Sequence, residues 1–106
     1  MREPTWLMLT ALAGAGRLHG YGITQEVERL STGRVWLRAG TLYAALDRLV
    51  DEGLVEPAGE EVVEGRLRRY YALSSEGRRC LAAEAEQRAR VSREALRRLS
   101  SAGGPA

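Results

Sequence analysis

The chain has 106 residues, of which 44% are hydrophobic, and this is enough for one domain with a single core. All 16 basic residues are arginines, whose forked guanidinium groups bind phosphate bidentately, although the formal net charge is only +2. This composition suits a nucleic-acid partner, but a GC-rich genome would explain the absence of lysine equally well.

A single cysteine, Cys80, excludes an internal disulfide, and with His19 as the only histidine the chain lacks the ligands of a structural zinc site. We therefore expect no metal and no cofactor. The apolar stretch at residues 6–15 is too short to span a bilayer and follows no basic segment of a signal peptide. We expect a cytoplasmic chain without a membrane partner.

The first predicted helix begins at Pro4, because proline suits a first turn, and ends at about Ala13, where Gly14 follows. Trp6, Leu9 and Ala13 share one of its faces. The predicted second helix spans about residues 20–30, since apolar residues recur there at helical spacing: Ile23, Val27 and Leu30.

A third helix is predicted over about residues 40–52, with Gly53 in a left-handed cap. Its buried stripe is expected to be Leu42, Leu46, Leu49 and Val50. An extended segment begins at Leu54, residues 56–65 are expected to form a polar turn, and residues 67–73 alternate as a strand does. The pattern after the third helix therefore predicts a hairpin.

A last helix is predicted from its N-cap, Ser74, to about Ser100. It carries a heptad seam made mostly of small side chains: Ala82, Ala85, Ala89, Ser92, Leu96 and Leu99. So much alanine makes the seam marginal alone, so this helix should need a partner surface. The expected organisation is a body over residues 1–73, a dimerisation helix over 74–100 and a flexible tail over 101–106.

Three helices followed by a two-stranded hairpin predict a mainly α winged helix-turn-helix fold with a small β-hairpin. In that fold the third helix lies in the DNA major groove and the wing reaches the flanking backbone. Arginines and tyrosines gather in the predicted wing, although they could merely solubilise it: Arg66, Arg68, Arg69, Tyr70 and Tyr71. On the third helix, Asp47 and Asp51 would be repelled by DNA unless they point away from it.

Tyr43 has two compatible interpretations, a half-buried aromatic between helices and a hydroxyl that reaches outward. His19, before the second helix, is expected to satisfy local backbone groups, with a phosphate contact as the alternative. No set of nucleophile, base and orienting group is present, and the glycines at 14, 16 and 20 do not have dinucleotide-binding spacing, so we expect no enzyme.

Several runs, taken together in their order, resemble the PadR family of transcriptional regulators: Leu18-His19-Gly20-Tyr21, Gly40-Thr41-Leu42-Tyr43, Arg69-Tyr70-Tyr71 with Leu73, and Glu76-Gly77-Arg78-Arg79. The likeness covers nearly the whole chain. It implies a winged-helix domain with a C-terminal dimerisation helix, usually a repressor and in some members released by a small molecule. The single short C-terminal helix is similar to the smaller subgroup of the family.

The resemblance implies double-stranded DNA and a second copy of the chain as partners. The expected DNA contacts are Arg38, Thr41, Tyr43, Arg48, Arg66, Arg68 and Arg69; Arg38 stands where the family commonly has a serine cap. The expected dimer interface adds Trp6 and Leu9 to the seam of the last helix. A small hydrophobic or aromatic effector is a candidate ligand, and Trp6 is the candidate residue for its pocket.

A rival interpretation is a winged-helix protein-interaction module that does not bind DNA. The basic wing would then be a solvated surface, and the alanine-rich helix would bind a different protein.

Overall fold

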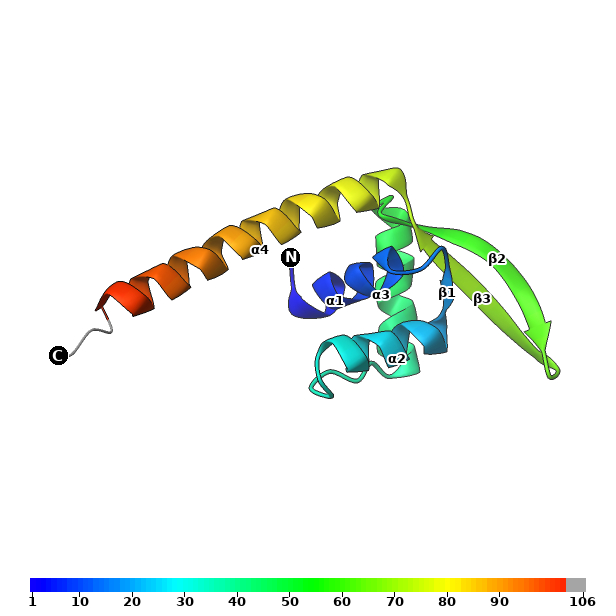
Figure 1. The fold of residues 1–106 in the computed structure, drawn as a ribbon. Helices are drawn as coiled ribbons and strands as arrows, with labels where there is room; N and C mark the ends of the chain where they lie inside the picture. Colours follow the sequence, from blue (N-terminus) through cyan, green and yellow to red (C-terminus); the bar gives the residue numbers. More distant parts are fainter. Residues whose placement is uncertain (103–106) are drawn as a thin grey trace.

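The structure, a computed structural model, describes residues 1–102. Its elements follow one another as α1 (Glu3–Ala13), β1 (Leu18–His19), α2 (Gly20–Leu30), α3 (Ala39–Asp51), β2 (Val55–Val63), β3 (Arg66–Leu73) and α4 (Ser75–Ala102). Helices α1 to α3 form a compact body, from which α4 and the β2–β3 hairpin project in opposite directions (Figure 1). The molecule therefore extends 64 Å along its longest axis against 28 and 21 Å across.

The core lies between α1, α2, α3 and the sheet, and the helical spacing of the sequence places its residues there. The largest fully buried side chains are Met8, Leu9, Leu12, Ile23, Val27, Leu46, Leu49 and Val55. The predicted stripe of α3 is confirmed for its three leucines, whereas Val50 is half-buried. Burial of each such leucine stabilises the fold by about 1.5–3 kcal/mol. The packing of this core therefore holds the three helices and the sheet together.

The hairpin is confirmed, but its turn is much shorter than predicted. Residues 55–63 form strand β2, and only Glu64 and Gly65 connect it to β3, both with positive φ (52° and 76°). Two left-handed residues define the tight turn that matches strand twist. The sequence predicts a turn at these polar residues because β2 lies at the sheet edge with most side chains in solvent, so no apolar alternation marks the strand.

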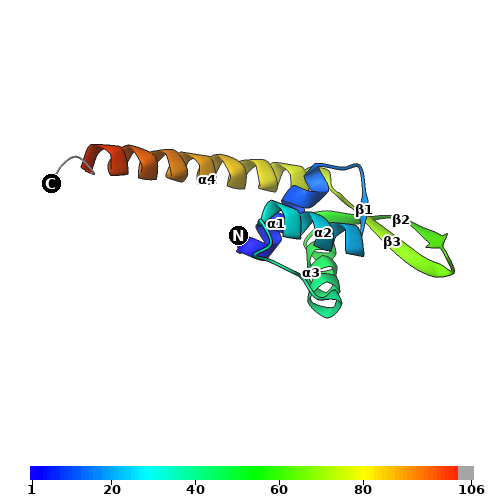
Figure 2. The same ribbon diagram turned by 60° about the horizontal axis from the view of Figure 1, so that its bottom comes forward.

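The sheet has a third strand that the sequence did not predict. Its order is β1-β3-β2, and the two residues of β1 pair antiparallel with β3, Leu18 opposite Tyr71 and His19 opposite Tyr70. A two-residue strand has no periodicity to detect. Its effect is to tie the start of α2 to the base of the wing (Figure 2).

The joint between the body and α4 is a capped helix start. The Ser74 hydroxyl accepts a hydrogen bond from the backbone N–H of Gly77 (2.9 Å) and donates one to the carbonyl of Gly53 (2.6 Å). Gly53 is left-handed as predicted, with φ +77°. A Cβ at Gly77 would lie 2.0 Å from the carbonyl oxygen of Leu54. Only glycine therefore allows this close approach of α4 to the body.

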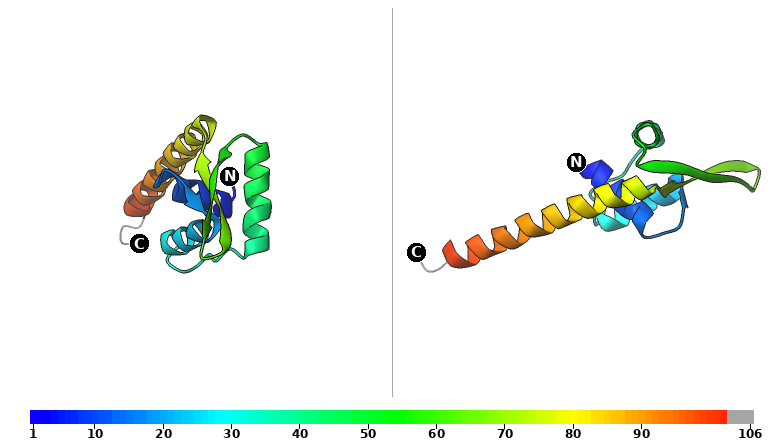
Figure 3. Two further views of the ribbon diagram at one scale, coloured as in Figure 1. Left: turned by 90° about the vertical axis from the view of Figure 1, so that its right-hand side faces the viewer. Right: turned by 90° about the horizontal axis from the view of Figure 1, so that it is seen from above.

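Helix α4 keeps contact with the body as far as Arg88, which pairs with Glu3 of α1, and from there it runs away from the body to Ala102 (Figure 3). This helix ends slightly later than predicted, and of the expected tail only residues 101 and 102 can be compared, both helical. Residues 103–106 of that expected tail lie outside the described part of the chain. Among residues 1–102 no helix is both long enough and apolar enough to cross a membrane.

Candidate nucleic-acid interface

The first turns of α3 expose mostly small residues beside the helix N-terminus. Arg38 occupies the N-cap position without a side-chain cap hydrogen bond, and Thr41 is exposed in the first turn. Gly40 and Ala44, also exposed, add almost no side-chain bulk. Free amides of a first turn attract anions, so the start of α3 can come close to a nucleic-acid backbone.

Tyr43 packs between α3 and the start of α2. Its side chain is 38% exposed, and a Cβ built on Gly20 would stand 2.3 Å from its hydroxyl oxygen. The tyrosine thus packs on bare backbone while its remaining surface faces solvent. The packing interpretation of Tyr43 agrees with this contact, because the hydroxyl end of the ring lies against Gly20. A hydroxyl that reaches outward and a contact of Tyr43 with DNA stay predictions.

The three wing arginines lie exposed on β3, and they line one side of a hollow of about 440 Å³ together with residues of α2 and α3. The residues around this hollow are His19, Gly20, Tyr21, Tyr43, Arg66, Leu67, Arg68 and Arg69. Glu60 and Glu61 of β2 stand directly opposite Arg69 and Arg68 in the ladder. Yet none of the ion pairs within residues 1–102 uses a wing arginine, so their charges are available to an anion.

Arg17, which the sequence analysis did not single out, holds the wing against the body. Its guanidinium donates to the Ala58 carbonyl (2.9 Å) and to Glu61 Oε1 (2.7 Å), and it lies 4.0 Å above the Tyr70 ring. The Tyr70 hydroxyl donates to the other oxygen of Glu61 (2.9 Å). Glu61 thus pairs with Arg17, and no ion pair within residues 1–102 joins it to Arg68. We call Arg17, Ala58, Glu61 and Tyr70 the wing latch.

His19 is expected to satisfy backbone groups at the start of α2, and the structure differs from this expectation. It occupies the N-cap position of α2 but makes no side-chain cap hydrogen bond; instead its ring meets Tyr70 edge-on with centroids 5.6 Å apart. Burial, and to a lesser degree the positive charge of Arg68, lowers the pKa of His19. The histidine thus packs at the junction of α2 and β3, and its alternative role as a phosphate contact stays a prediction.

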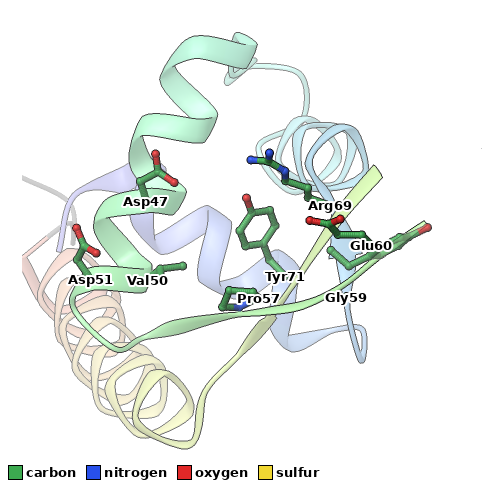
Figure 4. A pocket seen from close by; sticks show the side chains of 9 residues that line it. Asp47, Val50, Asp51, Pro57, Gly59, Glu60, Arg69 and Tyr71 are labelled. Atoms are coloured by element: carbon green, nitrogen blue, oxygen red, sulfur yellow. The ribbon is translucent and has the colours of Figure 1, made fainter. Parts of the chain in front are cut away.

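A second hollow, of about 630 Å³, separates α3 from the wing (Figure 4). Carboxylates of Asp47, Asp51 and Glu60 surround it, with Arg69 as the lining cation, and the buried ring of Tyr71 forms its floor. Burial raises the pKa of Tyr71, and the nearby Tyr43 and Asp47 raise it further, while Arg69 opposes them. This side of α3 is therefore acidic, in contrast to the basic hollow beside α2.

Arg48 lies on the opposite flank of α3, away from the wing. Its guanidinium pairs with Glu52 at 3.2 Å and donates to the Thr5 hydroxyl at 3.1 Å. These exposed contacts tie α3 to α1 and occupy the guanidinium. The expected DNA contact of Arg48 stays a prediction that requires these bonds to rearrange.

The residues expected at a dimer interface divide into two groups. Leu9 is fully buried in the core of its own chain, which corrects its expected place in an interface, because a partner cannot reach it. The seam of α4 is accessible at its distal end, where Leu96 and Leu99 are 67% and 69% exposed. Such a row of apolar side chains in water calls for a partner.

Trp6 is half-buried at the junction of α1 and α4. The Arg88 guanidinium lies 4.5 Å from the centre of its ring and also pairs with Glu3 at 3.5 Å. The indole also lines a hollow of about 350 Å³ with Leu7, Leu30 and Val35 and with three polar residues, Glu3, Ser31 and Arg34. Trp6 is therefore open to contact from outside the chain.

Within residues 1–102 no group of three or more His, Cys, Asp or Glu side chains is placed so that it could hold a metal ion.

Comparison with known proteins agrees with this geometry. The model of the transcriptional regulator PadR-like family matches residues 8–83. A 37.1 kDa protein of transposon TN4556 from Streptomyces fradiae is 44% identical over 81% of this chain, which spans only 23% of that protein. Transcriptional regulator Rv3488 of Mycobacterium tuberculosis is 34% identical over 79% of this chain and 75% of its own length.

Solved structures share the fold. A PadR family transcription regulator from Clostridium difficile superposes with a TM-score of 0.71 at 24% identity, over 92% of this chain and 98% of that one. Bacillus subtilis PadR, solved in complex with operator DNA, gives a TM-score of 0.68 at 22% identity, over 79% of this chain and 47% of that chain. The predicted winged-helix fold with its long C-terminal helix is confirmed.

Proposed function

Because the chain belongs to the PadR-like family of transcriptional regulators, and is thus a DNA-binding regulator rather than an enzyme, we propose that it is a cytoplasmic repressor that binds a pseudo-palindromic operator as a homodimer. The observation that carries this proposal is the basic hollow between α2 and β3. Its three arginines have no acidic partner within residues 1–102 and stand beside the start of α3. A repressor would act by covering the promoter.

In the proposed complex α3 enters the major groove, about 12 Å wide. Arg38, Thr41 and the first-turn amides of α3 reach the sugar-phosphate backbone near its N-terminus, and the wing arginines reach the backbone on the other side. Tyr43 sets the distance between these two groups of contacts because it packs against Gly20. Two copies related by a two-fold axis present their recognition helices one helical turn apart.

The dimer proposal rests on the exposed seam of α4. We propose that the seams of two copies pack together and that Trp6 contributes to the same interface from α1. A small hydrophobic or aromatic effector is proposed to enter beside Trp6, in the hollow that Leu30 and Val35 also line. Quenching of tryptophan fluorescence by such a compound, absent in Trp6→Leu, would support this part; no difference between the two proteins would contradict it.

The test is fluorescence anisotropy with the DNA upstream of the gene and a scrambled duplex, at 50 and 200 mM salt. Roughly 6–10 phosphate contacts predict a loss of about a thousandfold or more in affinity between these salt concentrations. The variant Arg68→Ala/Arg69→Ala should lose most of the affinity. The matched control is Arg97→Ala/Arg98→Ala, which removes the same charge at the far end of α4, where both arginines pair with Glu94.

Two outcomes would contradict the proposal. Equal effects of the two double substitutions would show that only overall charge matters. Weak, salt-insensitive binding to both duplexes, together with a stoichiometric protein partner in a pull-down, would favour the rival interpretation as a protein-interaction module.

A further inference from the structure

Asp47 is a charged residue in the middle of α3 without a bonding partner in the described chain. Its side chain is exposed and lies on the flank of α3 that faces the wing, at the hollow shared with Arg69 and Tyr71 (Figure 4). No hydrogen bond or ion pair within residues 1–102 uses its carboxylate. Asp47 is expected to be repelled by DNA unless it points away, and in the structure it lies on the exposed side of α3.

The neighbours of Asp47 on α3 leave it room to approach a base. Ala44 and Gly40 occupy the exposed face one and two turns earlier, respectively, and have little or no side chain. Arg48 is drawn to the opposite flank by Glu52 and Thr5. The helix backbone can therefore come near the floor of the major groove, and Asp47 is the polar side chain at mid-helix that is free to reach it.

The chemistry of a carboxylate limits what Asp47 can contact on DNA. It is a hydrogen-bond acceptor only and is repelled by phosphates. Guanine offers two acceptors in the major groove, thymine offers an acceptor and a methyl group, and adenine places an acceptor, N7, beside its amino group. Cytosine offers the N4 amino donor. A carboxylate therefore discriminates in favour of cytosine.

We propose that Asp47 determines operator specificity by accepting a hydrogen bond from the N4 amino group of one cytosine in each half-site. This inference rests on the proposed function, since it assigns a role within the same DNA complex. Arg69, across the hollow from Asp47, lies where a cation would offset the repulsion between the carboxylate and the flanking phosphates. Specificity at this base pair then comes from an acidic residue, while affinity comes from the arginines.

The experiment is selection of duplexes from a randomised pool by the wild-type protein and three variants, followed by sequencing and by anisotropy on the selected sites. Wild type should require cytosine at one position of each half-site, with a preference of about 5- to 150-fold. Asp47→Ala should lose the preference at that position alone. Asp47→Asn should change it to adenine, because an amide side chain pairs with adenine N6 and N7.

Asp51 supplies the matched control, since it is an exposed carboxylate of the same helix and lines the same hollow. Asp51→Asn should leave the selected sequence unchanged. If Asp47→Ala instead binds every duplex more tightly with an unchanged sequence preference, Asp47 is only a repulsive charge and the inference is overturned. If the wild-type protein selects no sequence at all, the proposed function fails as well, and the two failures are thus distinguished.

Discussion

Leucine side chains are buried in the body but exposed on the distal part of α4. Leu46 and Leu49 in the body are fully buried, whereas Leu96 and Leu99 of α4 are 67% and 69% exposed. The body closes its core with contacts inside one chain. Distal α4 runs away from the body (Figure 3), and no part of residues 1–102 covers Leu96 or Leu99. The difference teaches that stability of the body and assembly through α4 should be separable by mutation.

The largest expected effect comes from a variant that disrupts assembly through α4 and leaves the body folded. Leu96→Glu/Leu99→Glu places charges in the proposed interface and removes leucines worth about 1.5–3 kcal/mol each when buried. Dissociation of the dimer should become easier by more than about a hundredfold. Sedimentation should then find monomers, and their circular dichroism should still show a folded body. Retained dimers would place the interface elsewhere.

The joint between the two regions gives the next effect. Gly77→Ala forces a methyl group against the backbone of Leu54, where a Cβ would stand 2.0 Å from the carbonyl oxygen. Overpacking of this kind should lower the free energy of unfolding by about 1–3 kcal/mol in urea titrations. Gly40→Ala is the matched control in α3, since its Cβ would meet nothing within 4 Å. It should stabilise the helix by about 0.5–1 kcal/mol, and a similar cost for both substitutions would disprove the argument.

Within the body, the wing latch has a smaller expected effect. Arg17→Ala removes an exposed ion pair and a cation–ring contact, together worth about 1 kcal/mol. Hydrogen exchange in residues 58–70 should accelerate, while α2 keeps its protection. Arg29→Ala, which loses only an exposed pair with Glu26 on the same helix, should not change exchange in the wing. Identical exchange in wild type and Arg17→Ala would mean that the wing is held by its strands alone.

The smallest effect concerns pH. Burial lowers the pKa of His19 below its ordinary value of 6.5, so the unfolded chain binds more protons than the folded chain near that value. The contribution of His19 to the free energy of unfolding should therefore be fully present above about pH 6.5. It should decline as the pH falls toward the pKa of His19 in the folded chain. Urea midpoints at pH 7.5 and 5.5 should show this slope in the wild type. His19→Gln should flatten it, and a slope of opposite sign would contradict a lowered pKa of His19.

Much of the body could be predicted from local sequence patterns. The spacing of Ile23 and Val27 gave α2, the leucines of α3 gave its buried face, and Gly53 and Ser74 marked the end of one helix and the start of another. These signals suffice because a helix is specified by residues three or four apart and by its own caps. The arginines of the wing were found in the same way, as a cluster in one strand.

Other features depend on residues that meet only after folding. Strand β1, the length of β2 and the wing latch join positions of little local signal, such as Arg17 and Glu61, which are 44 residues apart. Helical spacing placed Leu9 on a face with Trp6, but only the packing of α1 against the core decided that Leu9 is buried and Trp6 half-open. Periodicity tells which residues share a face of an element; which surface covers that face is set by the tertiary contacts that bury the most apolar area.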